Sequence, residues 1–360
     1  MTKKVFVNFY VAKNFGDDAF VCLLAQRYRN VNFIIAGQRN KLKAFKSNQN
    51  IKIHSISIFQ RILIKLDDKL LNNGDFLYKQ MVRNVNYVVT IGGSIFIEPD
   101  HKYIEKYLAM KKNLFVPDKR NLILGANFGP YQDDFFYDFF KKEFKKYDYI
   151  SFRDHESYNL FCELNNVHYA PDILFGIKKL DVEGIEEPKK GYVILQVIEK
   201  TQNMEEYIAK NLEVIKYYNS KNLEVILMSL CENEGDLNVA KKIAKNSKSK
   251  IKIINYDGNI AEILTYIKNA DYLIGARFHS IVMSLVYGIP CLPISYSNKT
   301  DNLLKDINFE GLKVRINDFA RLTVEEIDRN RVNKYVVNVE KQVKNSEKHF
   351  TYLDKLLLGE

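Results

Sequence analysis

The stretch DYLIGARFHSIVMSLVYGIPCLPIS, residues 271–295, decides the fold class. It predicts an apolar strand over 272–275, a short turn, an apolar helix over 280–287 and a second strand over 290–295. A helix between two strands is typical of a βαβ unit on a parallel sheet. Ligands of such sheets bind beyond the carboxyl ends of the strands, so the turn after residue 275 is the first place to look for function.

The same alternation of periods extends in the N-terminal direction through the rest of the chain. It predicts strands over 5–9, 32–37, 86–91, 121–128, 149–153, 191–197, 224–230 and 251–255. Helices are predicted between them, for example over 18–29, 135–146 and 205–218. The pattern pauses over 178–190, where charged residues, Gly184 and Pro188 predict a linker.

These features predict an α/β protein with two Rossmann-like domains and a GT-B-like architecture. The chain of 360 residues is too long for one typical core, which also favours two domains. We expect an N-terminal domain over 1–177, a linker over 178–190, a C-terminal domain over 191–322 and a helical tail over 323–360.

Composition narrows the class of protein. No apolar run is long enough to span a bilayer, and the N-terminus lacks the pattern of a signal peptide, so we expect a cytoplasmic protein. The cysteines are far apart and are expected to be reduced core thiols, with no spacing that predicts a metal site: Cys22, Cys162, Cys231 and Cys291. The formal net charge of +10 suits an acidic substrate, an anionic membrane face or nucleic acid, but no nucleic-acid motif is present.

The turn at 275–280 carries the clearest chemistry. Gly275 allows a close backbone approach, and Arg277 and His279 stand at the start of a helix, where free N–H groups and the helix dipole favour anions. Together with the open amides at Phe278 and Ser280, they are suited to hold a phosphorylated acid. Lys299, after the next strand, either adds a second cation to this pocket or is a surface lysine.

Two glycine-containing loops in the N-terminal half are further candidates. In the loop Asn14–Asp18, Gly16 is expected to permit a turn with positive φ. Asp17 either accepts a hydrogen bond from a neutral, hydroxylated ligand or, like Asp18, caps the following helix. Gly92 and Gly93 follow the strand over 86–91 and either admit a ligand close to the backbone or make a tight turn.

Two more strand ends belong to the same predicted sheet. Asn127 lies in the small-residue loop GANFGP, residues 125–130, on the same edge as Gly92 and Gly93. Arg153 ends the strand over 149–153, just before a predicted helix cap at Asp154. Its guanidinium either binds a carboxylate or phosphate of a ligand or pairs with Asp154 or Glu156. Asp172 is a candidate cap after another short strand.

These loops, in this order, resemble the polysaccharide pyruvyl transferase family. The matching stretches are NFGDDA, GGS, GANFGP, SFRDHES, APD, IGARFHS and ISYSNK, which run from Asn14 to Lys299 and span most of the chain. Members of the family often begin with a Gly-x-Gly-Asn-x-Gly-Asp turn. Here Val11-Ala12-Lys13-Asn14 precedes Phe15-Gly16-Asp17, so a lysine stands in place of a glycine.

The resemblance implies transfer of pyruvate from phosphoenolpyruvate to a sugar, with a cyclic ketal as product and no metal or cofactor. It places the donor on the C-terminal domain at Arg277, Phe278 and His279, with Arg153 assisting. His279 is the expected general acid or phosphate ligand, the arginines neutralise the donor, and Asp17 orients or deprotonates the acceptor hydroxyl. The remaining expected acceptor-side residues are Asn14, Gly16, Gly92, Gly93 and Asn127.

Other readings of the same residues stay open. A GT-B glycosyltransferase could rest the diphosphate of a nucleotide sugar on the turn at Arg277–His279. A non-catalytic glycan-binding protein could use the same fold without turnover. The acceptor is expected to be a sugar of a surface polysaccharide; whether it is carried on a lipid, which would bring the protein to the inner membrane face, is left open.

Overall fold

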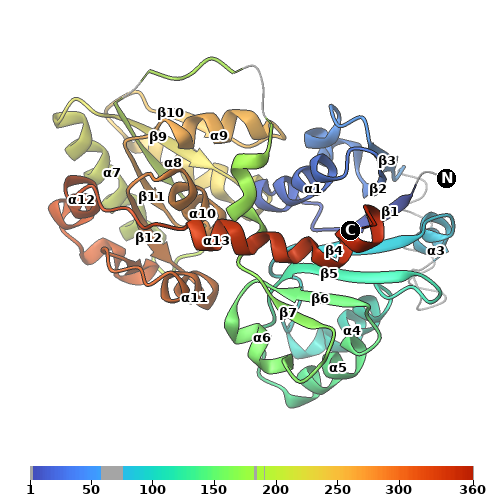
Figure 1. Ribbon diagram of the computed structural model, residues 1–360. Coiled ribbons are helices and arrows are strands. Elements are labelled where there is room, and N and C mark those ends of the chain that lie inside the picture. The colour runs from blue at the N-terminus through green and yellow to red at the C-terminus, as the bar shows by residue number, and fades with distance from the viewer. Residues whose placement is uncertain (1–2, 58–75, 182–184, 190, 360) are drawn as a thin grey trace. The chain divides into compact units, whose positions relative to one another are not determined.

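The computed structural model describes residues 3–57, 76–181, 185–189 and 191–359 (Figure 1). Its internal contacts divide the chain into two units. The first contains Met1–Val11, Phe20–Ile173 and Asn345–Glu360, and the second contains Ala12–Ala19 and Leu174–Lys344. The contact grouping places residues 12–19 and 174–177, which were predicted for the N-terminal domain, with the second unit, and residues 345–360 of the predicted tail with the first.

The first unit is built on a parallel sheet. Among the described residues its strand order is β3-β2-β1-β4-β5-β6-β7. The strands are β1 (Lys4–Asn8), β2 (Asn32–Gly37), β3 (Ile51–Ser55), β4 (Tyr87–Ile91), β5 (Arg120–Ala126), β6 (Tyr149–Phe152) and β7 (Val167–Tyr169). Successive strands are added on one side of β1 up to β3 and then on its other side from β4 onward, as in a Rossmann sheet. The loop after β4, with Gly92 and Gly93, therefore lies beside the switch point between β1 and β4.

Helices pack against the sheet of the first unit (Figure 1). They are α1 (Phe15–Arg27), α3 (Phe76–Val82), α4 (Ile104–Lys112), α5 (Asp134–Phe144) and α6 (His155–Phe161). On α5, Phe136, Phe140 and Phe144 recur every four residues and are buried together. Phe128 packs against Phe136 and Phe140 with ring centroids 5.4 and 5.5 Å apart. Each such buried ring contributes roughly 2–3 kcal/mol to folding.

The second unit repeats the plan. Its strand order, among the described residues, is β10-β9-β8-β11-β12-β13, with all pairs parallel. The strands are β8 (Tyr192–Gln196), β9 (Glu224–Ser229), β10 (Lys252–Asn255), β11 (Tyr272–Gly275), β12 (Cys291–Ser295) and β13 (Val314–Arg315). Here the switch point lies between β8 and β11, and the turn at 275–280 follows β11 directly.

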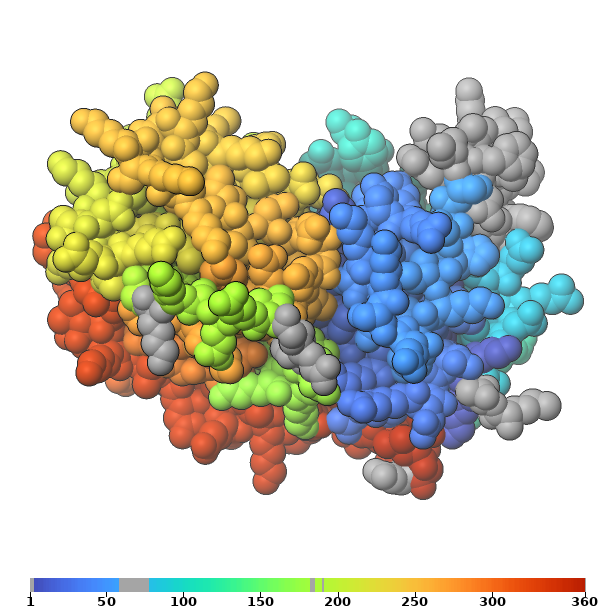
Figure 2. Space-filling view, turned by 90° about the horizontal axis from the view of Figure 1, so that it is seen from above, coloured from blue at the N-terminus to red at the C-terminus, as the bar shows by residue number. Residues whose placement is uncertain are grey.

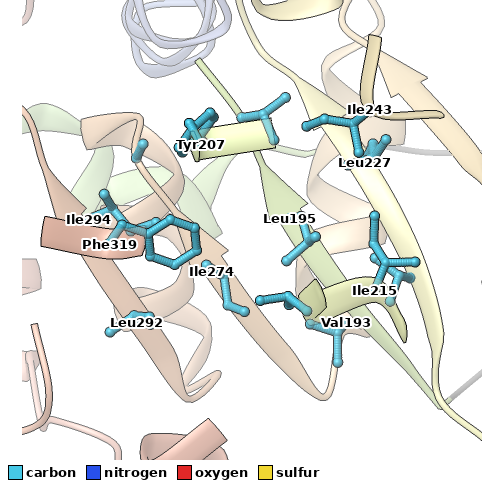
Figure 3. Packing of buried hydrophobic residues seen from close by; sticks show 14 of the residues in the cluster. Val193, Leu195, Tyr207, Ile215, Leu227, Ile243, Ile274, Leu292, Ile294 and Phe319 are labelled. Atoms are coloured by element: carbon cyan, nitrogen blue, oxygen red, sulfur yellow. The ribbon is translucent and has the colours of Figure 1, made fainter. Parts of the chain in front are cut away.

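Alternate residues of these strands build the core of the second unit. Val193 and Leu195 on β8, and Ile274 on β11, point to the same face of the sheet (Figure 3). They meet buried side chains of α7 (Met204–Ser220) and α8 (Asp236–Asn246), among them Ile215 and Ile243. The further helices are α9 (Ile260–Lys268), α10 (Phe278–Tyr287) and α11 (Asn298–Asp306).

The predicted C-terminal helical tail is a series of short helices. These are α12 (Val324–Val332), α13 (Glu340–Ser346), the 3-10 turn η7 (Glu347–Phe350) and α14 (Thr351–Leu357). The last of them is tied to the first unit, because Asp354 accepts hydrogen bonds from Arg27 at 2.9 and 2.7 Å and from the Tyr28 hydroxyl at 2.7 Å. The end of the tail, residues 345–360, therefore belongs to the first unit, while α12 and most of α13 group with the second.

Several elements escaped the sequence analysis. β3, β13, α3, α4 and α11 are short or lack a clean apolar period, so no single pattern marks them. The cysteines are free, as expected, but Cys162 is exposed and is not a core thiol. Of the described residues, no helix is both long and apolar enough to cross a bilayer.

Candidate active site

The turn after β11 is held rigidly by the neighbouring strand. Gln196, at the end of β8, accepts hydrogen bonds through Oε1 from the backbone N–H groups of Ala276 at 3.0 Å and Arg277 at 2.5 Å. Ser280 donates its backbone N–H and its hydroxyl to the carbonyl of Arg277, at 3.0 and 2.6 Å. Arg277 is the N-cap of α10, so Phe278, His279 and Ser280 form the first turn of that helix, as predicted.

Arg277 is buried and its charge is matched by two carboxylates. Its Nε and Nη2 donate to the two oxygens of Asp236 at 3.0 and 2.5 Å, and its Nη1 donates to Glu234 at 2.5 Å. Burial alone would lower the pKa of Arg277, but its hydrogen bonds to Asp236 and the charge of Glu234 raise it instead. Arg277, predicted to bind the donor, is thus already paired with carboxylates of the second unit. This favours a role in positioning the turn over direct contact with a ligand.

His279 lies on the first turn of α1. A Cβ atom built on Gly16 would be 1.7 Å from Nδ1 of His279 and 2.0 Å from its Cε1. Only a glycine leaves room for the imidazole at this place. The structure therefore brings together two residues that were predicted for different sites, His279 on the donor side and Gly16 on the acceptor side, at the point where the N-termini of α1 and α10 meet.

Backbone hydrogen bonds explain why residues 12–19 belong to the second unit. The N–H of Phe15 donates to the carbonyl of Leu230 at 3.1 Å, and the Asn233 amide donates to the carbonyl of Ala12 at 2.7 Å. Asn14 forms a bridge with Cys231 and accepts the N–H of Gly16 at 3.0 Å through its side chain. It is therefore Asn14 that satisfies an amide at the start of α1, a role predicted for Asp17 or Asp18.

The predicted positive φ at Gly16 is wrong. Gly16 lies within α1, which begins at Phe15, and the left-handed residue of the loop is Lys13, with φ of 49°. Lys13 stands where related sequences often have glycine, which adopts this conformation at no steric cost. The loop keeps its shape with a lysine because its flanks are fixed by the hydrogen bonds to residues 230–233.

Asp17 and Asp18 are both buried in the first turn of α1. Asp18 accepts a hydrogen bond at 2.7 Å from the hydroxyl of Tyr256, at the end of β10. Burial raises the pKa of Asp18 well above its ordinary value, although the bond from Tyr256 opposes this and Asp17 adds to it. Asp18 therefore keeps its proton to a higher pH than an ordinary aspartate does.

Tyr296, which directly follows β12, lies close to cationic side chains. The ammonium groups of Lys299 and Lys200 lie 5.3 and 5.5 Å from the centre of its ring. Burial would raise the pKa of Tyr296, but the charges of Lys299, Arg277 and Lys200 outweigh it and lower that pKa. The predicted donor residue Lys299 therefore lies in a cationic corner of the second unit, on the second residue of α11.

The remaining predicted residues form a buried cluster in the first unit. The guanidinium of Arg153 pairs with Asp172 at 2.9 Å and donates to the side-chain oxygen of Asn127 at 2.7 Å. A Cβ atom on Gly93 would be 2.3 Å from Nη1 of Arg153. Gly92, the preceding residue, has φ of 149°. Arg153 thus lies with the residues predicted for the acceptor, while Arg277, Phe278, His279, Ser280 and Lys299 belong to the second unit.

Asp154 and Asp172, both candidate helix caps, make different contacts in the structure. Asp154 caps α6 by accepting the N–H of Ser157 at 2.8 Å, which confirms the predicted cap. Asp172, a candidate cap, is the ion-pair partner of Arg153. For Arg153, the sequence leaves both ligand binding and pairing with Asp154 or Glu156 open; its 2.9 Å ion-pair partner lies 19 residues away along the chain.

Sequence analysis missed several residues around these clusters. Glu234 and Asp236 follow β9, and Lys200 follows β8, so the rule of searching strand ends would have found them. Tyr296 lies inside the ISYSNK stretch, but its neighbours in space gave no sequence signal. His349, buried in η7, bonds to Ser151 and to the Pro171 carbonyl, both at 2.8 Å, and no local pattern connects these positions. In the part of the chain that the structure describes, no three His, Cys, Asp or Glu side chains are placed to hold a metal ion.

Comparison with known sequences agrees with the predicted resemblance. A family model described as "Polysaccharide pyruvyl transferase" matches residues 14–298. No curated protein matches the chain. The match begins at Asn14, in the loop that contacts His279, and ends just before Lys299.

Solved structures share the fold at low sequence identity. A Listeria monocytogenes protein assigned as a UDP-N-acetylglucosamine 2-epimerase has a TM-score of 0.67 and 12% identity, over 100% of this chain and 98% of its own. The UDP-GlcNAc 2-epimerase of Neisseria meningitidis, bound to UDP-GlcNAc, gives 0.62 and 11%, over 100% of both chains. A UDP-glucose: anthocyanidin 3-O-glucosyltransferase in complex with UDP gives 0.56 and 10%, again over 100% of both. The predicted GT-B-like class of two Rossmann-like units is confirmed.

Proposed function

The chain belongs to the polysaccharide pyruvyl transferase family, and from that premise we propose that it transfers pyruvate from phosphoenolpyruvate to a sugar. The acceptor is a sugar of a surface polysaccharide or of its lipid-linked precursor, and the product is a pyruvate ketal across two hydroxyls. One observation carries the proposal: the starts of α1 and α10 meet at the contact of Gly16 with His279, in the same unit as Lys299.

The chemistry of this corner suits a small, doubly acidic donor. Two helix N-termini supply amides and positive dipole ends, and Lys299 supplies an ammonium group beside Tyr296. Lys200 lies beside the same ring, with its ammonium 3.4 Å from a carboxylate oxygen of Glu234. Phosphoenolpyruvate carries a carboxylate and a phosphate on one short frame. We assign its binding to Phe278, His279 and Lys299. Arg277 and Ser280 are assigned to fixing the turn, because the guanidinium of Arg277 is held by Asp236 and Glu234 and Ser280 donates its N–H and its hydroxyl to the carbonyl of Arg277.

The proposed reaction begins with proton transfer from His279 to the methylene carbon of the donor, which makes its central carbon electrophilic. A sugar hydroxyl attacks that carbon and loses its proton, with Asp17 as the proposed base. Phosphate then leaves, and a second hydroxyl closes the ketal. The two hydroxyl protons balance the one taken up by the new methyl group and the one carried away by hydrogen phosphate. The cationic corner stabilises the charge that develops on the leaving phosphate.

The acceptor side is proposed to include the cluster of the first unit. Gly92 and Gly93 are buried at the carboxyl end of β4, beside the switch point where ligands of Rossmann sheets bind. Arg153 and Asn127 support this loop from behind, because Arg153 fills the space that a side chain at residue 93 would need. In this assignment Arg153 is a positioning residue.

Phosphorus NMR tests the proposed reaction. The protein is mixed with phosphoenolpyruvate and a panel of glycans and lipid-linked sugars, and we expect the donor signal to be replaced by inorganic phosphate only when the right acceptor is present. His279→Gln should abolish this conversion, while Lys341→Gln, an exposed lysine on α13, should leave it intact. An unchanged donor with every acceptor would contradict the proposal.

A thermal-shift comparison separates the nucleotide-sugar alternative. Phosphoenolpyruvate should raise the unfolding temperature of the wild type and not that of His279→Gln, because a ligand stabilises the state that binds it. UDP and UDP-sugars should have no such effect. Stabilisation by UDP alone would favour a glycosyltransferase, and a glycan that binds without turnover with any donor would favour a binding protein.

A further inference from the structure

One surface of the second unit carries a run of exposed lysines without intervening acidic residues. Exposed lysines follow one another on α8 and in the loop after it; we call these five residues the lysine patch: Lys241, Lys242, Lys245, Lys248 and Lys250. They equal half of the formal net charge of +10. No Asp or Glu occurs anywhere between residues 237 and 256. The surface around this segment is yellow to orange in Figure 2, with long side chains projecting from it.

This surface differs from two other lysine-bearing helices of the protein. On α7, Lys210 pairs with Glu213, and on α5, Lys141 pairs with Glu163 of the neighbouring segment. No lysine of the patch makes an ion pair with any residue that the structure describes. Lys252, the next lysine along the chain, is excluded from the patch because its ammonium lies on the ring of Tyr266, 4.6 Å from the centre.

The patch is electrostatically unfavourable in isolation. Lys241 and Lys245 are four residues apart on one face of α8, where like charges repel each other. The buried side of the same helix, with Val239, Ala240 and Ile243, is fully used by the core. The exposed side therefore holds unmatched positive charge on a rigid support, and an anionic partner would relieve the repulsion.

We propose that the lysine patch docks the second unit onto an anionic lipid surface. Lysines are flexible, strongly hydrated charges that suit the diffuse field of acidic headgroups, whereas specific phosphate recognition favours arginine, which the patch lacks. The segment also lacks the interleaved aromatic residues of single-stranded nucleic-acid sites. None of the large exposed apolar side chains described for the chain lies in it, so binding is electrostatic, reversible and sensitive to salt.

Vesicle co-sedimentation tests the proposal without any enzyme assay, so it stands or falls independently of the proposed reaction. The full chain should sediment with phosphatidylcholine vesicles that contain about one third phosphatidylglycerol, should remain in solution with pure phosphatidylcholine, and should be released as salt is raised. Each lysine at such a surface strengthens binding roughly fivefold, so K241Q/K242Q/K245Q should weaken it about a hundredfold.

A matched variant removes the same number of charges elsewhere. K102Q/K106Q/K112Q alters exposed lysines of the first unit and should bind the vesicles nearly as well as the wild type. Equal losses in both variants, equal binding to neutral vesicles, or unchanged binding by the α8 variant would each overturn the proposal. So would tighter binding to duplex DNA than to the anionic vesicles, lost in the α8 variant, because the patch would then serve a nucleic acid.

Discussion

His279 occupies the space that a side chain on Gly16 would need. The start of α10 therefore packs closely against the start of α1 because residue 16 has no Cβ atom. Gly16 has ordinary helical geometry and carries no positive φ that would by itself require a glycine. The demand for glycine therefore comes from the imidazole, which makes residue 16 a sensitive probe of where that ring must lie.

Gly16→Ala should displace the imidazole and reduce kcat/KM for pyruvyl transfer about a hundredfold, the scale of a misplacement of ~1 Å. Stability should change little, because alanine favours a helix over glycine by about 1 kcal/mol and offsets part of the clash. Steady-state kinetics and thermal unfolding measure the two effects. In a His279→Ala background no ring meets the new Cβ atom, so Gly16→Ala should raise the unfolding temperature; a lower unfolding temperature there would show that Gly16 acts through something other than the ring.

Arg277→Met should destabilise the second unit by about 3–5 kcal/mol, because it leaves the fully buried Asp236 without its bidentate partner. Urea unfolding measures this change. The double variant Arg277→Met with Asp236→Asn should recover much of the loss, since no lone carboxylate remains buried. If Arg277→Met instead unfolds at the wild-type midpoint and loses only affinity for phosphoenolpyruvate, Arg277 is a donor ligand and our positioning role is wrong.

The sequence predicted the parts of this fold that depend on local periodicity. Alternating apolar residues such as Val193 and Leu195 mark strands, and the cap at Asp154 follows from its place before a helix. Searching the ends of strands led directly to the turn at Arg277–His279. These predictions succeed because a strand end and a helix start are each determined by a few consecutive residues.

Contacts between distant segments could not be predicted in this way. Arg277 and Asp236 are 41 residues apart, and each alone resembles an ordinary surface or capping residue in the sequence. The grouping of residues 12–19 with the second unit depends on hydrogen bonds to Leu230 and Asn233, which no period in either segment indicates. The sequence therefore identified the loops of the candidate site, and the structure was needed to show which of them meet.

Tyr296 should ionise at a lower pH than an ordinary tyrosine, because the charges of Lys299, Arg277 and Lys200 outweigh the effect of burial. The phenolate absorbance of the wild type minus that of Tyr296→Phe isolates this group. Lys299→Met should raise the pKa of Tyr296. Bound phosphoenolpyruvate should raise the pKa of Tyr296 as well, because an anion beside the ring disfavours the phenolate, whereas a neutral sugar should leave it unchanged. If phosphoenolpyruvate does not change the pKa of Tyr296, the donor binds away from this residue.

His349 should make the first unit sensitive to acid. Its Nε2 faces the carbonyl of Pro171, which can only accept, so the neutral ring carries its proton on Nε2 and accepts the Ser151 hydroxyl at Nδ1. Burial disfavours a charged ring, and with the nearby charge of Arg153 it lowers the pKa of His349 from 6.5 to about 4. Because the pKa of His349 is lower in the folded than in the unfolded protein, the neutral ring contributes fully to the free energy of unfolding above pH 6.5. This contribution is lost as the pH falls from 6.5 toward 4.

The loss should reach about 3 kcal/mol at the acid end of this window. Urea unfolding of the wild type and of His349→Gln across the same pH range measures it, because glutamine can still donate to the Pro171 carbonyl but does not titrate. We expect the wild type to be the more stable protein at neutral pH and to lose that advantage progressively on acidification. Parallel pH profiles for the two proteins would mean that His349 keeps a near-normal pKa and that the tail does not bury it.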